Sequence, residues 1–165
     1  MGRIRQATEE DAKGIAEIYN EYVLNSVVTF EEQIVEPSIM ASRIKAIQAL
    51  GLPWLVAVDE CLNIIGYAYA SQWKTRSAYA QSVEITVYLT EECQSKGWGS
   101  NLYQRLFTLL KAKGVHVVIA GIALPNPASI ALHKKFNMKK VGHFEQVGRK
   151  FNRWIDVAYW QGILT

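Results

Sequence analysis

Cysteine is scarce in this chain, and long hydrophobic runs are absent. Two cysteines, Cys61 and Cys93, stand among 165 residues, which is too few and too isolated for a disulfide framework or a metal site. No apolar stretch approaches the roughly 20 residues that a membrane-spanning helix needs. The first residues, M-G-R-I-R-Q, lack the apolar segment of a secretion signal. We therefore expect a cytoplasmic protein with reduced thiols, no metal and no membrane contact.

The chain also lacks a large excess of either sign of charge. The 18 Lys and Arg residues are scattered among 15 Asp and Glu residues, which leaves a net charge of +3. No basic run indicates a nucleic-acid surface, so we expect no nucleic acid as a partner. A chain of 165 residues with 50% hydrophobic residues suits one domain, residues 1–165, with one core.

Two common phosphate-binding motifs are missing, but a related pattern is present. A strand at 83–89 is followed by Q-S-K-G-W-G (94–99), which opens an amphipathic helix. A dinucleotide fingerprint would need a third glycine where Leu102 stands, and a P-loop would need Gly-Lys-Ser/Thr. Gly97 and Gly99 nevertheless leave bare N–H groups at a helix N-terminus, where the helix dipole favours an anion. Alone, such a turn is more often a tight connection than a ligand site.

A carboxylate in the middle of the same strand is the most informative single residue. The alternation places Glu84 and Thr86 on the face opposite Val83 and Ile85. Burial raises the pKa of a carboxyl group toward neutrality, where a general base should lie. The alternative is a glutamate that faces water or pairs with a cation. The glycine turn that follows favours the catalytic interpretation.

The remaining pattern predicts an α/β fold with a mixed central sheet and helices on both faces. The unit from Val83 to Ile122 predicts two parallel strands joined by a helix, and the apolar run 116–122 predicts that the second strand is covered on both faces. The N-terminal strands are expected to pair antiparallel. Further strands are expected at 3–7, 54–58, 64–71, 141–147 and 151–162, and further helices after Thr8, at 37–51 and at 127–136.

Two loops carry side chains that suit a ligand. The apolar loop 27–30 either packs against the core or forms a pocket wall. The loop 72–81 gathers aromatic and cationic side chains, as ligand-binding loops often do. A surface loop with a packed Trp73 explains the second pattern equally well.

Together these motifs resemble the GNAT acetyltransferases. The pattern of that superfamily is a strand, Q-x-x-G-x-G, a helix, a strand, and an Asn that opens a short helix, and Gln94, Gly97, Gly99 and Asn126 follow it in order. The chain is more closely similar to the branch of phosphinothricin and methionine sulfone (sulfoximine) N-acetyltransferases. That similarity covers nearly the whole chain and includes W-K (73–74), S-V-E-I-T-V-Y-L (82–89) and V-G-R-K-F-N-R-W-I-D-V (147–157). Asn137-Met138 departs from the usual Gly-Phe or Gly-Tyr.

The resemblance implies acetyl-coenzyme A as the cosubstrate and a small amine as the acceptor. The parallel pair would be splayed around the pantetheine arm, which the strand backbone and Asn126 would bind, and the amides of the glycine turn would bind the pyrophosphate. The implied coenzyme A contacts are Val87, Tyr88, Leu89, Ser95, Lys96, Gly97, Trp98, Gly99, Ser100 and Asn126. The implied acceptor contacts are Phe30, Lys74, Thr75, Arg76, Glu84, Ile85 and Thr86, with the arginine suited to a carboxylate.

Two residues are implied in catalysis. Glu84 would take the amine proton directly or through a water, while a strand amide near Val87 would meet the oxyanion. His133 stands where many relatives carry a tyrosine that protonates the leaving sulfur, and it would act in that way or by relaying the amine proton. The alternative is a structural histidine with satisfied hydrogen bonds.

The expected function is direct acetyl transfer to an amino-acid-like amine. One alternative is acetylation of a protein N-terminus or lysine, which an open groove would favour, and another is a coenzyme A sensor without catalysis. The branch also points to a homodimer, with Trp154 and Trp160 as candidate interface residues. Cys93 has no assigned role.

Overall fold

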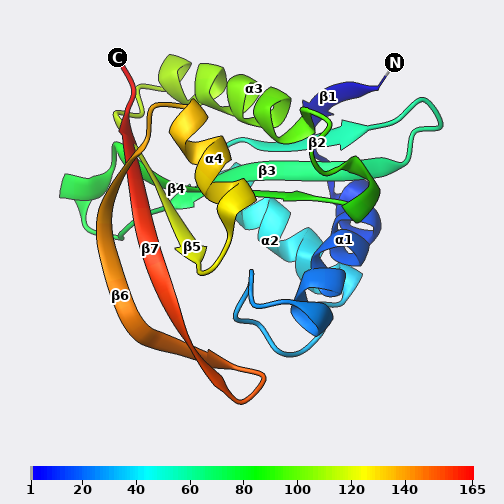
Figure 1. Ribbon diagram of the computed structural model, residues 1–165. Helices are drawn as coiled ribbons and strands as arrows, with labels where there is room; N and C mark the ends of the chain where they lie inside the picture. Colours follow the sequence, from blue (N-terminus) through cyan, green and yellow to red (C-terminus); the bar gives the residue numbers. More distant parts are fainter. Residues whose placement is uncertain (1) are drawn as a thin grey trace.

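A mixed sheet organises the structure, as predicted, and helices cover both of its faces (Figure 1). The computed structural model describes residues 2–165, which form seven strands in the order β1-β2-β3-β4-β5-β7-β6. Neighbouring strands are antiparallel except for β4 and β5. The strands are β1 (Arg3–Gln6), β2 (Trp54–Val58), β3 (Ile64–Gln72), β4 (Ser82–Leu89), β5 (Val117–Ala123), β6 (Lys139–Lys150) and β7 (Arg153–Ile163). The α-helices are α1 (Ala12–Asn25), α2 (Pro37–Ala49), α3 (Trp98–Ala112) and α4 (Pro127–Lys135).

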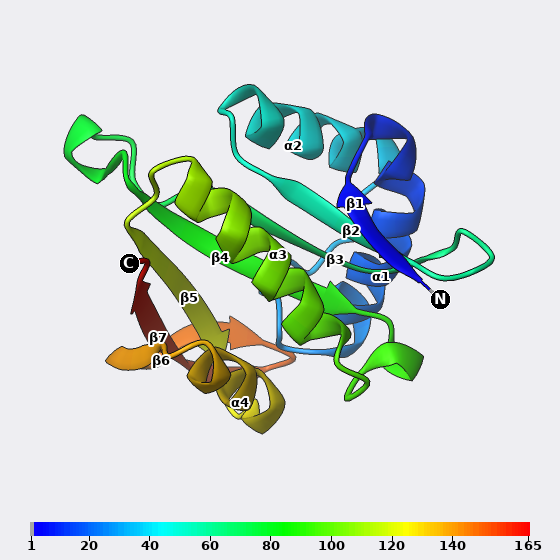
Figure 2. The same ribbon diagram turned by 90° about the horizontal axis from the view of Figure 1, so that it is seen from above.

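Each face of the sheet has its own hydrophobic cluster. The stripe of α3, with Leu102, Leu106 and Leu110 fully buried, packs on the face of β2 to β5 that carries Val83 and Ile85. Figure 2 shows α3 lying along this face. Helices α1 and α2 cover the other face through a cluster that includes Trp54 and Tyr67. The period-two alternation of β4 therefore assigned its two faces correctly.

The sheet divides between β4 and β5. Their register holds for only three pairs, from Ser82↔Val117 to Glu84↔Ile119. Beyond Glu84, β4 stays paired with β3 as far as Leu89, whereas β5 stays paired with β7 as far as Ala123. Because each strand keeps its outer partner, the two strands diverge and leave peptide groups without a strand partner along the gap.

The peptide groups that face this gap follow from the ladder. In antiparallel pairing, alternate residues direct both peptide groups to the same neighbour. Thr90 N–H donates to Ile65 O on the β3 side, so Tyr88 also directs its groups to β3. Val87 and Leu89 direct theirs to the gap.

Three details of the second half of the chain differ from expectation. Strand β6 is longer than predicted and β7 begins at Arg153, because Phe151 and Asn152 form a two-residue turn with φ of 50° and 62°, and a phenylalanine gives no signal for such a turn. Strand β5 is not covered by helices on both faces, since Gly121 on one face lines a cavity. Trp160, expected at a surface interface, is 6% exposed in the core, whereas Trp154 is 58% exposed.

Candidate active site

A cavity of about 580 Å³ opens where β4 and β5 diverge. Its floor comes from these two strands, and its walls come from α3, α4, the loop after α1 and the β6–β7 hairpin. A volume of this size lies in the range typical of small-molecule sites. The lining residues are Val28, Thr29, Phe30, Glu84, Ile85, Thr86, Val87, Tyr88, Tyr103, Ala120, Gly121, Ala123, Asn126, Ser129, His133, Phe144, Val147, Val157 and Tyr159.

Glu84 is the acidic residue of this lining, and it is half-buried. Burial raises the pKa of its carboxyl group above the ordinary value of 4.5, while the nearby Lys74 ammonium lowers it and leaves a net rise. Within residues 2–165 the Glu84 carboxylate has no ion pair and no side-chain hydrogen bond to the protein. Its oxygens therefore have no partner among the described residues that would compete with a bound molecule.

The turn before α3 is shaped by two residues with left-handed backbone. Ser95 has φ of 60° and Gly97 has φ of 88°, and Gly97 caps the helix that starts at Trp98. A helix N-terminus leaves its first N–H groups without intrahelical partners, which here are those of Trp98, Gly99 and Ser100. The conformation of the predicted anion-binding turn thus exposes the expected amides.

Gly99 carries further information because the protein itself does not require a glycine there. Its φ is not left-handed, and a Cβ at this position would meet Leu132 at 3.4 Å, an ordinary contact. The packing of this chain would therefore accept a side chain at this position. Close approach of a ligand to the backbone is the usual reason for such a glycine.

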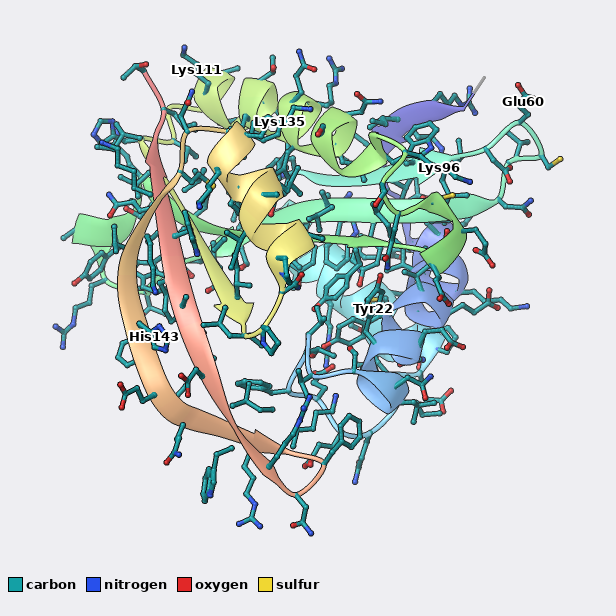
Figure 3. The ribbon with its side chains drawn as sticks, in the orientation of Figure 1. Tyr22, Glu60, Lys96, Lys111, Lys135 and His143 are labelled. Carbon is teal, nitrogen blue, oxygen red and sulfur yellow. The ribbon has the colours of Figure 1, made fainter. Side chains whose placement is uncertain are left out.

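Two cations stand beside the turn. Lys96, labelled in Figure 3, belongs to the turn itself and was predicted. Lys135 of α4 was not predicted, yet its Nζ lies 3.0 Å from the Ser100 hydroxyl that it donates to. Nothing in the sequence pairs these distant positions, because α4 reaches α3 only through the tertiary fold.

The end of β4 is tied to the glycine turn by a residue that sequence reasoning missed. The Tyr22 hydroxyl donates to Leu89 O at 2.5 Å, and Gln94 Nε2 donates to the same hydroxyl at 3.0 Å. Gln94 is the glutamine of Q-x-x-G-x-G, so its side chain serves this link. The Leu89 carbonyl is thereby occupied, while the Leu89 N–H and both peptide groups of Val87 still face the gap.

Helix α4 brings Asn126 and His133 to the cavity. Asn126 caps the helix by accepting from Ser129 N at 3.1 Å, as predicted. His133 is 3% exposed. Its Nδ1 donates to Ser129 O at 2.6 Å, and its Nε2 lies 2.9 Å from the Tyr103 hydroxyl. Burial lowers the histidine pKa, so we assign a neutral ring whose Nε2 accepts from Tyr103.

Tyr103 is a second residue that the sequence concealed. It lies within the apolar stripe of α3, where its ring packs edge-on against His133 with centroids 5.3 Å apart. Its only signal in the sequence is a hydroxyl in an otherwise aliphatic and aromatic stripe. Tyr159 of β7 is a third such residue. It packs against Phe144 and Trp73, and its hydroxyl pKa is raised first by burial and then by the charge of Glu84.

The predicted acceptor residues divide into two groups. Phe30, Glu84, Ile85 and Thr86 line the cavity, although the buried side chain of Ile85 belongs to the core under α3 and only its backbone faces the cavity. Lys74, Thr75 and Arg76 do not line it and are exposed. The reason is that their loop stands out beyond the start of β4 (Figure 2).

Of those three loop residues, Lys74 is the one whose charge reaches the cavity. Its Nζ lies 4.9 Å from the centre of the Trp73 ring, which packs on Tyr159, and it acts on the pKa of Glu84. Tyr88 lines the cavity with its side chain and not with its backbone, because its peptide groups point to β3. Cys93 packs against the α3 core cluster.

Two further features are absent from the part of the chain that the structure describes. Residues 2–165 contain no group of three or more His, Cys, Asp or Glu side chains placed to hold a metal ion. Over the same residues, no helix has the length and apolar character to cross a membrane.

Comparison with known proteins gives the family. Residues 4–159 match the Acetyltransferase (GNAT) domain. The chain is 40% identical to a phosphinothricin N-acetyltransferase of Streptomyces coelicolor, over 96% of this chain and 94% of that protein. It is 35% identical to an L-methionine sulfoximine/L-methionine sulfone acetyltransferase of Pseudomonas paraeruginosa, over 96% and 92%.

A solved structure agrees with these sequence similarities. The phosphinothricin acetyltransferase of Sinorhizobium meliloti, in complex with acetyl-coenzyme A, superimposes with a TM-score of 0.95 and 40% identity, over 99% of this chain and 88% of that one. The split sheet and glycine turn described above fit the cosubstrate of that complex, since they offer peptide groups for an extended arm and amides for a pyrophosphate. The chain belongs to the GNAT acetyltransferases and, within them, to the N-acetyltransferases of the phosphinothricin and methionine sulfoximine branch.

Proposed function

We propose that this protein transfers the acetyl group of acetyl-coenzyme A directly to the free amine of a small amino-acid-like acceptor, with Glu84 as the general base. The observation that carries the proposal is the position of Glu84. Its carboxylate lines the cavity at the last register pair before β4 and β5 separate, has no partner in residues 2–165, and has a raised pKa. If the pantetheine arm of acetyl-coenzyme A were bound in the gap, the thioester at its end would lie beside this carboxylate.

The chemistry requires one proton acceptor and one hydrogen-bond donor. Glu84 takes a proton from the acceptor ammonium, directly or through a water, and the freed nitrogen attacks the thioester carbonyl carbon. The Val87 N–H, which faces the gap, donates to the oxyanion that forms. Collapse of this intermediate breaks the C–S bond, and the second proton, which the attacking nitrogen still carries, passes directly or through water to the leaving thiolate to give coenzyme A and the N-acetyl product.

His133 has a supporting role in this proposal. Its Nδ1 proton is committed to Ser129 O, and its Nε2 accepts from Tyr103. The lowered pKa favours the neutral ring, which has no spare proton for the sulfur. An unperturbed thiol has a pKa of about 8.5, so the thiolate leaves at neutral pH with little need of an acid. We infer that His133 positions Tyr103 and the start of α4.

The acceptor side favours a small molecule over a protein. The loop after α1 and the β6–β7 hairpin wall the acceptor side of the cavity, whose total volume of about 580 Å³ lies in the range of small-molecule sites. Acetylation of a protein N-terminus or lysine would require a more open groove. For a substrate carboxylate we propose Lys74 in place of Arg76, because Lys74 acts on the pKa of Glu84.

An acceptor screen tests the proposal. Free thiol release is measured with acetyl-coenzyme A and a broad panel of amines that includes methionine sulfone, methionine sulfoximine and phosphinothricin. We expect turnover of at least one of these three. Activity on other amines alone would contradict the substrate class, and no activity with any amine would contradict the enzyme proposal. Tight acetyl-coenzyme A binding with negligible turnover, unchanged in Glu84→Gln, would instead indicate a sensor.

We also propose that the protein is cytoplasmic, where acetyl-coenzyme A is available, and that it forms a homodimer, as its branch suggests. The candidate interface is the outer face of the β6–β7 hairpin, where Val141, Phe151 and Trp154 are each more than half exposed. Light scattering of the purified protein checks this. We expect a dimer mass for the wild type and a shift toward monomer in Trp154→Glu, and a monomeric wild type would rule the dimer out.

A further inference from the structure

The motif V-G-R-K-F-N-R-W-I-D-V (147–157) ends the chain's resemblance to its branch, and the proposed chemistry uses none of its polar residues. In the fold it forms the tip of the β6–β7 hairpin, far in sequence from the loop after α1. The tip nevertheless reaches that loop at Thr29 and Phe30, both of which line the cavity. The contacts between these two segments suggest what the motif does.

Gly148 makes room for the Phe30 ring. A Cβ built on Gly148 would lie 2.4 Å from Cε2 and 2.5 Å from Cζ of Phe30, so close that the ring would have to move. The φ of Gly148 is not left-handed, so its backbone could carry any residue. With a glycine here, an aromatic ring that lines the cavity can lie directly against the hairpin backbone.

Lys150 holds the neighbouring residue. Its side chain is 1% exposed, and its Nζ donates to Thr29 O at 2.8 Å. Burial lowers the lysine pKa, while the charges of Glu32 and Glu31 act in the opposite direction. Removing an ammonium group from water is costly unless it is hydrogen-bonded. The bond to the Thr29 carbonyl offsets part of this cost and ties the loop to the hairpin. From the other side, the Tyr19 hydroxyl lies 2.7 Å from Thr29 Oγ1.

The rest of the motif keeps Gly148 and Lys150 in register. The pairing of β6 with β7 shifts between Phe144 and Gly148, and Asp156 closes this irregularity by accepting from Gln146 N–H at 2.8 Å. His143 Nε2 lies 2.8 Å from the other Asp156 oxygen. Since a register slip of one residue would turn every side chain to the opposite face, these contacts decide which residues meet the loop.

We propose that Gly148 and Lys150 are positioning residues that fix Phe30 and Thr29 as the acceptor-side wall of the cavity, and that they thereby set which amines fit. This inference rests on the proposed function, because it assigns the wall to the acceptor. The two residues act through the loop and touch no substrate themselves.

The first test separates the acceptor from acetyl-coenzyme A. In Gly148→Ala the methyl group displaces the Phe30 ring, and we expect the KM for methionine sulfone and for phosphinothricin to rise roughly tenfold or more, because small misplacements of a binding wall are costly. The KM for acetyl-coenzyme A should stay within about twofold, since its site lies on β4 and α3. Gly142→Ala is the matched control, because no atom lies within 4 Å of a Cβ there. Equal effects of the two variants would overturn the inference.

A double mutant checks that the effect passes through Phe30. Phe30→Ala removes the ring that meets the new methyl group, so adding Gly148→Ala to it should change the acceptor KM less than about twofold. Lys150→Met keeps the length of the side chain but removes the donor, and it should also raise the acceptor KM. Lys139→Met, at an exposed lysine of the same strand, is its control. Additive effects of Phe30→Ala and Gly148→Ala would contradict the inference.

A measurement without turnover keeps the two proposals apart. Hydrogen exchange of the amides in residues 27–31 should be faster in Gly148→Ala and Lys150→Met than in the wild type and both controls. Unchanged exchange would overturn the inference whatever the acetylation assay gives. Faster exchange in a protein that acetylates no amine would support the positioning of the loop by Gly148 and Lys150 and would refute the proposed function.

Discussion

The two ends of the active site are built in different ways. The end proposed for acetyl-coenzyme A consists of peptide groups from one short stretch of chain, β4 and the turn into α3, with Asn126 added. The acceptor end consists of side chains from four separate segments, namely the loop after α1, β4, β5 and the β6–β7 hairpin. In the proposed site, a ligand common to many relatives would thus be held by backbone, and the variable ligand by side chains that substitution can change without disturbing the fold.

The largest effect is expected where the two ends meet. Glu84→Gln keeps the size of the side chain but removes the base, so kcat should fall by about 10² to 10⁴-fold. The KM values for both substrates should change little, since neither binding end is altered. Steady-state kinetics by thiol release measure this, with Glu92→Gln, at an exposed glutamate outside the cavity, as control. A loss of less than tenfold would remove Glu84 from its role.

The same residue predicts a pH dependence. Only the ionised carboxylate accepts a proton, and burial raises the Glu84 pKa above 4.5. The acid side of the kcat/KM profile should therefore fall below a pKa higher than 4.5, and Glu84→Gln should abolish this limb. A limb that persists in the variant would belong to another group, such as the amine of the acceptor.

The acetyl-coenzyme A end is tested by a change that the fold tolerates. In Gly99→Ala the new methyl group meets Leu132 at an ordinary distance, and alanine favours a helix more than glycine does. The melting temperature should therefore stay the same or rise. The KM for acetyl-coenzyme A should nevertheless rise roughly tenfold, and the acceptor KM should not. A rise in both would mean that the two ends are not independent.

The acceptor end offers a smaller effect and an internal control. Lys74→Ala removes the cation whose field reaches Glu84, and an exposed pair of charges contributes about 1 kcal/mol, or roughly a factor of five in acceptor KM. Arg76→Ala, two residues further along the exposed loop, should change it less than about twofold. The reverse ranking would restore Arg76 as the carboxylate ligand that the sequence predicted.

The smallest effect on catalysis is expected at His133. His133→Phe leaves the buried Tyr103 hydroxyl without its acceptor, so the free energy of unfolding should fall by about 1–3 kcal/mol. The kcat should fall less than about tenfold. Because the unfolded histidine gains a proton below about pH 6.5 and the buried one resists it, wild-type stability should decline as pH falls through that range. A kcat loss of 10²-fold or more would instead indicate an acid.

The local structure around β4 and the glycine turn was easier to predict from the sequence than the long-range contacts of the cavity. Gly97, Gly99 and Glu84 were found because a glycine turn, a helix start and a period-two strand are local patterns. Lys135, Tyr22 and Tyr103 were missed because each acts on a partner at least 30 positions away. Arg76 lies on an exposed loop outside the cavity lining, and composition cannot say which way a loop leaves the sheet.

By itself, the sequence determined the elements, the two faces of β4, the helix cap at Asn126 and the family, because each depends on short-range periodicity or backbone preference. Only the tertiary structure decided that β4 and β5 separate after Glu84, that Trp160 lies inside and Trp154 outside, and that the hairpin tip meets Phe30. These three features depend on which strand keeps which partner and on how segments distant in sequence pack together, and a local sequence pattern contains neither kind of information.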